Sequence, residues 1–261
     1  MFRNAPYWYR TFPRLSHTVL RIYGANYERE MELLDVLCDR SRTGIDIGAK
    51  VGMYTHRLLA HCADVIAFEP IPLFAHMLER VFEQRRCRVE PYALSNRRAP
   101  VTLRMPYRAD GGPEFGRSTI EPANRLEHWR ISSSVEQTVE TRTLDGCRVQ
   151  DVGFIKVDVE GHEIPVLDGA ERTIASSRPN MLVECNDDHQ PNGVAKLARW
   201  LTEHGYAGYF ALGKTLLPIE RFASGEHWQH HGVENFICIH RSRPETVQAV
   251  ARRLNGHQAP R

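Results

Sequence analysis

Three ionisable residues occupy every second position in the stretch FIKVDVEGHE, residues 154–163. Its apolar residues predict a strand over 153–157, and because side chains alternate along a strand, Lys156, Asp158 and Glu160 share one side. Burying these groups without partners is costly, so they should lie at the carboxyl end of the strand, facing a cleft or one another. A carboxylate in a cleft can accept the proton of a hydroxyl group. Asp158, Glu160 and Lys156 are therefore the candidate catalytic residues, although for Lys156 we favour an ion pair with one of the acids.

A second motif, GIDIGAKVGMYT, covers residues 44–55. Its apolar start predicts a strand that turns at Gly48, and a helix that begins near Gly52 with backbone N–H groups able to face a ligand. Glu69 ends the next apolar run, where an acid can accept hydrogen bonds from both ribose hydroxyls. These features predict one nucleoside over the carboxyl ends of neighbouring strands. The alternative is an ordinary strand-to-helix turn followed by an incidental acid.

The spacing of the glycines indicates which nucleoside binds. A dinucleotide site usually has the pattern GxGxxG with the pyrophosphate at the helix N-terminus, whereas this sequence has D-x-G-x-x-x-G. Asp46 is poorly suited to a pyrophosphate but suits an ammonium group, such as that of S-adenosylmethionine. The pattern therefore favours S-adenosylmethionine over a nicotinamide cofactor, and a methyl-transfer enzyme over an oxidoreductase.

The elements that must position these residues alternate between short β-branched runs and helical patterns, which is typical of a parallel sheet covered by helices on both faces. Strands are predicted at 43–47, 64–68, 88–92, 153–157 and 180–184, with two final strands at 206–212 and 235–240. Helices are predicted at 53–62, 74–84, 166–176, 194–204 and 244–254. We therefore expect an α/β fold with a mostly parallel sheet of seven strands.

The length of 261 residues fits one such domain with additions. We expect an N-terminal helical and aromatic extension over 1–40, the main domain over 41–242 and a C-terminal helix and tail over 243–261. Residues 99–150 interrupt the alternation and form either a functional loop or an inserted hairpin. This region and the late EHWQHH loop (226–231) should select the acceptor, through aromatic and basic side chains: Tyr107, Phe115, Trp129, Trp228, Arg104, Arg108, Arg117 and Arg125.

Composition excludes several classes of protein. A formal charge of +2 from 34 basic and 32 acidic residues provides no concentrated positive field, so nucleic acid is not an expected partner. The six cysteines have neither paired nor zinc-like spacing and indicate free thiols in a reducing, cytoplasmic setting. No segment resembles a signal peptide or a membrane span. Four aromatic residues near the N-terminus could contact a lipid surface or cover a substrate, but packing against the domain is the interpretation that we favour: Tyr7, Trp8, Tyr9 and Phe12.

Five segments together resemble the FkbM family of S-adenosylmethionine-dependent methyltransferases: DIGAKVGMYT, FEP, YALSN, FIKVDVEGHEIPVLDGA and MLVECN. The resemblance runs from about Tyr27 to His240. It implies a Rossmann-like class I methyltransferase fold and O-methylation of a hydroxyl on a carbohydrate or other polyhydroxylated acceptor, in a glycan, glycolipid or secondary metabolite. One departure is Lys50, where the family usually has Asn.

The resemblance also implies roles for individual residues. Glu69 would hold the ribose, and Ala93 and Leu94 would flank the adenine ring. Asp158 would lie beside the sulfonium methyl, within reach of the acceptor hydroxyl. The methionine portion would be lined by the residues of the glycine turn and the helix after it: Asp46, Gly48, Ala49, Gly52, Tyr54 and Thr55.

Three further questions stay open at this level. Asp158, Glu184 and Asn186 could bind Mg²⁺, or Glu184 could pair with Lys156 while Asn186 caps a turn, so the sequence does not identify a metal site. His162 is either a second base or, as we favour, a polar residue ahead of a helix that begins near Ile164 or Pro165. The chain could also be a non-catalytic glycan-binding or scaffold protein that retains the fold. The sequence does not indicate the oligomeric state.

Overall fold

The computed structural model describes residues 5–22, 28–109, 111–126 and 131–256. Its strands are β1 (Thr43–Ile47), β2 (Val65–Phe68), β3 (Cys87–Glu90), β4 (Ala93–Leu94), β5 (Ala99–Arg108), β6 (Ile131–Arg142), β7 (Val152–Val157), β8 (Asn180–Glu184), β9 (Tyr206–Leu212), β10 (Thr215–Pro218) and β11 (Asn235–His240). Its α-helices are α1 (Ala5–Thr11), α2 (Pro13–Ile22), α3 (Leu34–Leu37), α4 (Met53–Leu58), α5 (Pro72–Phe82), α6 (Glu163–Asp168), α7 (Glu171–Ser177), α8 (Gly193–Glu203), α9 (Gln229–His231) and α10 (Pro244–Leu254).

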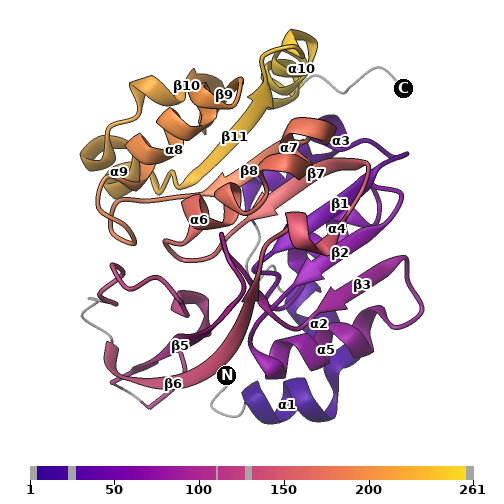
Figure 1. The fold of residues 1–261 in the computed structure, drawn as a ribbon, viewed down its shortest axis with the longest axis vertical. Helices are drawn as coiled ribbons and strands as arrows, with labels where there is room; N and C mark the ends of the chain where they lie inside the picture. The colour runs from indigo at the N-terminus through magenta and orange to yellow at the C-terminus, as the bar shows by residue number, and fades with distance from the viewer. Residues whose placement is uncertain (1–4, 23–27, 110, 127–130, 257–261) are drawn as a thin grey trace.

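The main sheet has eight strands in the order β10-β9-β11-β8-β7-β1-β2-β3 (Figure 1). From β8 to β3 neighbouring strands are parallel, whereas β11 runs antiparallel to both β8 and β9. The carboxyl ends of β1, β2, β7 and β8 therefore meet at one edge of the sheet, as expected for an α/β sheet whose ligand binds at that edge.

Both faces of this sheet are covered by helices, which is why its central strands are almost continuously apolar. Alternate side chains of β7 illustrate this, since Ile155 packs with Val166 and Leu197 of α6 and α8, while Phe154 packs with Leu58 and Leu254 of α4 and α10. The α/β class and the mostly parallel sheet are thus as predicted.

Two details of the prediction are wrong. The sheet has eight strands rather than seven, because the chain reverses at Gly213 and adds the edge strand β10, which pairs antiparallel with β9. Because β10 has only four residues and ends in proline, its sequence hardly indicates a strand. Proline is tolerated there because β10 lies at the edge of the sheet. The helix predicted at 166–176 is two helices, because Gly169 passes so close to the Ser95 carbonyl oxygen that a Cβ atom would lie 2.0 Å from it.

The interruption at 99–150 contains a long antiparallel hairpin, β5 and β6. With β4 it forms a second sheet of three strands, in the order β4-β6-β5, separate from the main sheet (Figure 1). Of the two alternatives, the inserted hairpin is the one that the structure contains. We call residues 99–142 the hairpin insertion.

At the N-terminus, α1 and α2 lie against α5 (Figure 1). The ring centroids of Tyr9 and Phe74 are 5.8 Å apart, and Leu20 joins the same apolar cluster as Phe74 and Met77. Within the described residues, every helix is too short or too polar to cross a membrane.

Candidate active site

A cavity of about 680 Å³ opens at the carboxyl ends of β1, β2 and β7. Its walls combine apolar side chains with the buried carboxylate of Glu69, and Asp158 and Glu160 line one side. The insertion contributes Phe115. The residues predicted to flank adenine, Ala93 and Leu94, form β4 and line this cavity. We call it the nucleoside cavity.

Glu69 is fixed in the wall of the nucleoside cavity by backbone donors. Its Oε2 accepts a hydrogen bond from the Lys50 N–H at 2.6 Å, and its Oε1 accepts one from the Ile71 N–H at 2.7 Å. Burial raises the pKa of Glu69 to about 7, although these hydrogen bonds oppose the shift. Since each carboxylate oxygen has a further lone pair, Glu69 can hold the turn and still accept ligand hydroxyls.

The turn after β1 brings the ends of β1 and β7 into contact. Gly48 has φ +83°, and a Cβ atom at this position would lie only 1.8 Å from the carbonyl oxygen of Asp158. The Asp158 N–H in turn donates to the Ile47 carbonyl at 3.0 Å. Glycine is therefore required here by the protein's own backbone, and this contact sets how far Asp158 stands from the glycine turn.

Lys50 also has a left-handed backbone, with φ +50°. Asparagine tolerates this conformation better than most residues, which accounts for Asn at the corresponding family position. The Lys50 side chain extends to the insertion, where its Nζ lies 2.7 Å from the position that a Cβ on Gly116 would occupy. Lysine thus bridges the glycine turn and the insertion, where the shorter Asn would not reach.

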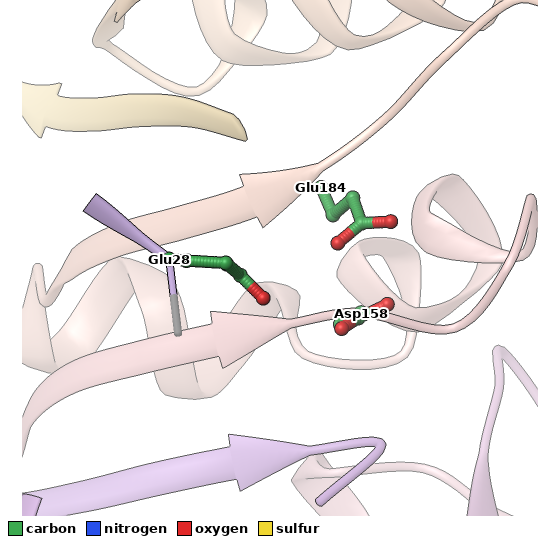
Figure 2. A group of neighbouring side chains, drawn as sticks. All are labelled: Glu28, Asp158 and Glu184. Atoms are coloured by element: carbon green, nitrogen blue, oxygen red, sulfur yellow. The ribbon is translucent and has the colours of Figure 1, made fainter. Parts of the chain in front are cut away.

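A second cavity, of about 640 Å³, adjoins the first and shares four lining residues with it: Gly48, Lys50, Asp158 and Glu160. Five carboxylic acids line it, against two lysines: Glu28, Asp46, Asp158, Glu160 and Glu184, with Lys50 and Lys156. We call it the acidic cavity. In Figure 2 the carboxyl groups of Glu28, Asp158 and Glu184 converge, and one oxygen of each lies within 4.8 Å of the others.

Lys156 supplies the positive charge for this cluster. The side chain is only 1% exposed, and its Nζ donates to Asn235 Oδ1 at 2.8 Å and lies 3.9 Å from Glu28 and 3.8 Å from Glu184. Burial alone would lower the pKa of Lys156, but Glu28 and neighbouring acids outweigh burial and raise it. Lys156 thus forms an ion pair as expected, but with Glu28 and Glu184 rather than with Asp158 or Glu160.

The polar residues at the end of β8 are arranged as in the metal-free alternative. Glu184 lies beside Lys156, and Asn186 Oδ1 accepts a hydrogen bond from the His189 N–H at 2.9 Å, which caps the turn after β8. Since Asn186 does not line the acidic cavity, the predicted set of Asp158, Glu184 and Asn186 does not come together as Mg²⁺ ligands.

Asp46 lies at the back of the acidic cavity, where its Oδ2 accepts a hydrogen bond from the Thr55 hydroxyl at 2.5 Å. Burial raises the pKa of Asp46 to about 6, opposed by Thr55 and the charge of Lys156. Thr55 is fully buried behind Asp46, whereas Tyr54 faces the cavity and donates its hydroxyl to Glu28 at 2.7 Å. Gly52, φ +79°, packs against Leu78 and is set back from both cavities.

The insertion is attached to the segment after β7. The backbone of Glu160 is left-handed, φ +56°, and its carbonyl oxygen accepts hydrogen bonds from Thr119 Oγ1 at 2.8 Å and Asn124 Nδ2 at 2.9 Å. Its carboxyl Oε2 is buried without a hydrogen bond, although His189 Nε2 lies 3.2 Å away. Burial and the charge of Asp158 raise the pKa of Glu160.

His162 lies immediately before α6 and serves the same attachment. Its Nδ1 is 2.8 Å from Glu121 Oε2 of the insertion, and its Nε2 is 2.9 Å from Ser95 Oγ. Glu163, the first residue of α6, accepts a hydrogen bond from the Gly161 N–H. The preferred interpretation of His162, a residue ahead of a helix, therefore matches its position.

Sequence reasoning missed two residues of the acidic cluster, Glu28 and Asn235. Asn235 Nδ2 donates to Glu28 Oε2 at 3.1 Å, so the two hold each other beside Lys156. Glu28 belongs to the charged run YEREME, which has the composition of an exposed segment, and Asn235 begins β11. The sequence around these two residues does not indicate a role in the site, because only the folding of the chain brings them to Lys156.

The residues proposed to select the acceptor do not all line one cavity. Phe115 lines the nucleoside cavity, and Arg117 and Arg125 line a further cavity that includes Asn124 and His189. Arg104 donates to backbone carbonyl groups, Arg108 pairs with Glu114, and Trp228 donates to Asp188. Tyr107 belongs to β5. Trp129 lies outside the described residues.

Comparison with known proteins identifies the family. The model of the methyltransferase FkbM domain matches residues 46–207, from Asp46 in the acidic cavity to the start of β9. The chain belongs to the FkbM methyltransferase family. Its glycine turn, Glu69, and Asp158 all fall within the matched FkbM domain.

Two similar proteins, one curated and one with a crystal structure, show how far the similarity of this FkbM domain extends. The hexuronic acid methyltransferase AglP of Haloferax volcanii is 29% identical over 159 residues, which are 58% of this chain and 59% of AglP. The crystal structure of methyltransferase FkbM from Methylobacillus flagellatus KT has a TM-score of 0.51 and 16% identity, over 77% of this chain and 44% of that one. The chain thus spans less than two thirds of each, and the second comparison supports the class I methyltransferase fold.

Proposed function

We propose that this protein is an S-adenosylmethionine-dependent O-methyltransferase that acts on a hydroxyl group of a carbohydrate or another polyhydroxylated acceptor. The observation that carries the proposal is the junction of the two cavities at Gly48 and Asp158. The nucleoside cavity is largely apolar away from Glu69 and the residues that it shares with the acidic cavity, and the acidic cavity is lined by five carboxylic acids. This pairing suits a nucleoside joined to a cationic chain.

The chemistry of the donor set fits the cofactor. In the nucleoside cavity, Ala93 and Leu94 would contact the adenine ring and Glu69 would accept the ribose hydroxyls. In the acidic cavity, Asp46 and its neighbours would neutralise the sulfonium and ammonium groups. S-Adenosylmethionine, when bound, supplies a methyl group on a positively charged sulfur atom.

The chain's own contribution to the reaction would be a base and a fixed geometry. Asp158 lines both cavities, so its carboxylate would accept the proton of the attacking hydroxyl where donor and acceptor meet. Lys156 would act as a positioning residue, since its contacts with Glu28 and Glu184 hold the acids of the cluster together. The insertion would limit the access of water from the side of Phe115.

Among possible acceptors we favour an acidic sugar. Lys50 lines both cavities, and within the described part of the chain its ammonium group makes no ion pair under 4 Å. Such a cation would bind a sugar carboxylate. The similarity to AglP, whose name specifies hexuronic acid, supports the same class of acceptor.

The proposal is tested by transfer of labelled methyl groups from S-adenosylmethionine to uronic-acid-containing and neutral glycans, with and without a chelator. We expect label in the glycan fraction, more on the acidic glycans, and no effect of the chelator. Calorimetric measurement of S-adenosylhomocysteine binding is an independent test. Absence of binding to well-folded protein would favour the alternative of a non-catalytic protein that retains the fold.

Substitution of Glu69 tests the ribose site. We expect Glu69→Gln to weaken the binding of S-adenosylhomocysteine by roughly 10- to 100-fold, because a hydrogen bond to a charged group contributes about 1.5–3 kcal/mol. Calorimetric titration measures the change. Glu79→Gln, at an exposed position of α5 away from both cavities, is the matched control and should bind like the wild type. Equal binding by Glu69→Gln would remove Glu69 from the cofactor site.

The pH dependence of binding tests the acidic cavity. The pKa of Asp46 is about 6, and a bound cation favours its ionised form, so protons are released on binding and the affinity rises with pH. Since S-adenosylhomocysteine lacks the sulfonium charge, the affinity ratio of S-adenosylmethionine to S-adenosylhomocysteine should rise by up to about tenfold between pH 5 and pH 7. Titrations at both pH values measure this ratio. A ratio that stays constant would show that Asp46 does not sense the sulfonium.

A further inference from the structure

The outward faces of α1 and α2 carry large apolar side chains in an unusual concentration. Tyr7 is 61% exposed, Trp8 44%, Phe12 45%, Leu15 56% and Ile22 73%. Among the described residues with large exposed apolar side chains, only Val135 lies elsewhere. Single exposed apolar residues are common on soluble proteins, but five on two adjoining helices mark an interaction surface.

Packing on the domain, the role favoured from the sequence, accounts for the inner faces of these helices but not for the exposed side chains. In α2 the residues that face the core are Ser16, His17 and Leu20, and Leu15 and Ile22 project from the opposite side. Trp8 of α1 contacts Phe12, the residue between α1 and α2, with ring centroids 5.4 Å apart, while Tyr9 faces Phe74. Both helices therefore already have a buried face, and the apolar outer face is additional.

The charges of this surface have one sign. The sequence contains no Asp or Glu before Glu28, whereas the rest of the chain has nearly balanced charges. Arg10, Arg14 and Arg21 are exposed on the two helices. Arg14 contacts Glu83 of α5 at 3.2 Å, and Arg10 and Arg21 make no ion pair within the described residues. Aromatic and aliphatic side chains flanked by arginines match the interface of an anionic lipid bilayer.

We propose that the outer face of α1 and α2 binds an anionic phospholipid membrane surface, with Trp8, Phe12, Leu15 and Ile22 inserted at the level of the headgroups and the arginines beside the phosphates. This role goes beyond the proposed methyl transfer and does not depend on it. His17 of α2 lies 3.5 Å from the carbonyl oxygen of Gly52, which follows the glycine turn of the site. Docking by these helices would therefore hold the acidic cavity close to the membrane, where a lipid-linked acceptor would be presented.

Flotation of the purified full chain with vesicles tests the proposal without reference to activity. We expect binding to vesicles of phosphatidylcholine with phosphatidylglycerol, weaker binding to phosphatidylcholine alone, and loss of binding at high salt. The double variant Leu15→Ser/Ile22→Ser should bind at least about tenfold more weakly, because two apolar anchors no longer enter the interface. Since both positions are exposed, the thermal unfolding of this variant should match that of the wild type.

The matched control is Val135→Ser, which removes an exposed apolar side chain of the insertion and should leave vesicle binding unchanged. Three results would overturn the proposal. The first is wild-type protein that fails to float with anionic vesicles, and the second is a double variant that floats as well as the wild type. The third is a wild-type dimer in lipid-free sedimentation that the double variant abolishes, since the face would then be a contact between copies of the chain.

Discussion

The Asp158→Asn variant is expected to lose methyl transfer by about 10²- to 10⁴-fold in kcat, the usual contribution of a positioned general base. Its amide retains the size of the side chain but cannot accept the proton of the acceptor hydroxyl. The backbone contacts of Asp158 with Gly48 and Ile47 involve only main-chain atoms, so the substitution leaves them intact. Affinity for S-adenosylhomocysteine, measured by calorimetry, should change by only a few fold.

Asp64→Asn is a suitable control, because Asp64 is an exposed acid just before β2 and lies away from both cavities. It should retain wild-type kcat. If Asp158→Asn transfers methyl groups at the wild-type rate to the true acceptor, Asp158 is not the base. If instead it loses affinity for S-adenosylhomocysteine together with activity, its role is in binding rather than proton transfer.

The Gly48→Ala variant is expected to be the least stable single substitution in the site, with a loss of roughly 3–5 kcal/mol in the free energy of unfolding. Two costs add. The left-handed backbone at φ +83° is unfavourable for alanine, and its Cβ would lie 1.8 Å from the Asp158 carbonyl oxygen, so β1 and β7 would have to separate at their carboxyl ends. Urea unfolding monitored by circular dichroism measures the change.

Gly213→Ala separates the two costs. Gly213 also has a positive φ, +59°, but a Cβ atom there would meet no atom within 4 Å. The free energy of unfolding of Gly213→Ala should therefore fall by only about 1 kcal/mol, which is the cost of the backbone conformation alone. Similar losses for both variants would mean that the contact between Gly48 and Asp158 is not tight.

Much of the sheet could be predicted because parallel strands buried on both faces are short, apolar and separated by helices. The bounds of β1, β8 and α10 agree with the predicted ranges 43–47, 180–184 and 244–254. The candidate catalytic residues also converge as expected on one cavity, because carboxyl ends of parallel strands share an edge. The alternation along a strand was not the reason for all three, because β7 ends at Val157, before Asp158 and Glu160, and the backbone of Glu160 is left-handed.

What could not be predicted depends on contacts between distant segments. Glu28 reaches Lys156 only because the segment before α3 crosses the end of β7, and Asn235 only because β11 inserts between β8 and β9. The break between α6 and α7 lies at Gly169, whose carbonyl oxygen accepts a hydrogen bond from the N–H of Asp145 in a distant segment. For Lys156, Glu184 was one of the partners considered from the sequence, whereas Glu28 was not, because the sequence does not show which distant acids lie near it.

The way in which the insertion is attached to the core limits which of its segments can be replaced by those of a related protein. Thr119 and Asn124 bind a backbone carbonyl group of the core, and Glu121 binds His162, so one short segment of the insertion makes these attachments. The ends of β5 and β6 farthest from β4 take no part in them. Substrate preference could therefore be changed through side chains on the distal ends of β5 and β6. A graft of the connection between these strands, which contains residues 119–124, would have to bring compatible partners at positions 160 and 162.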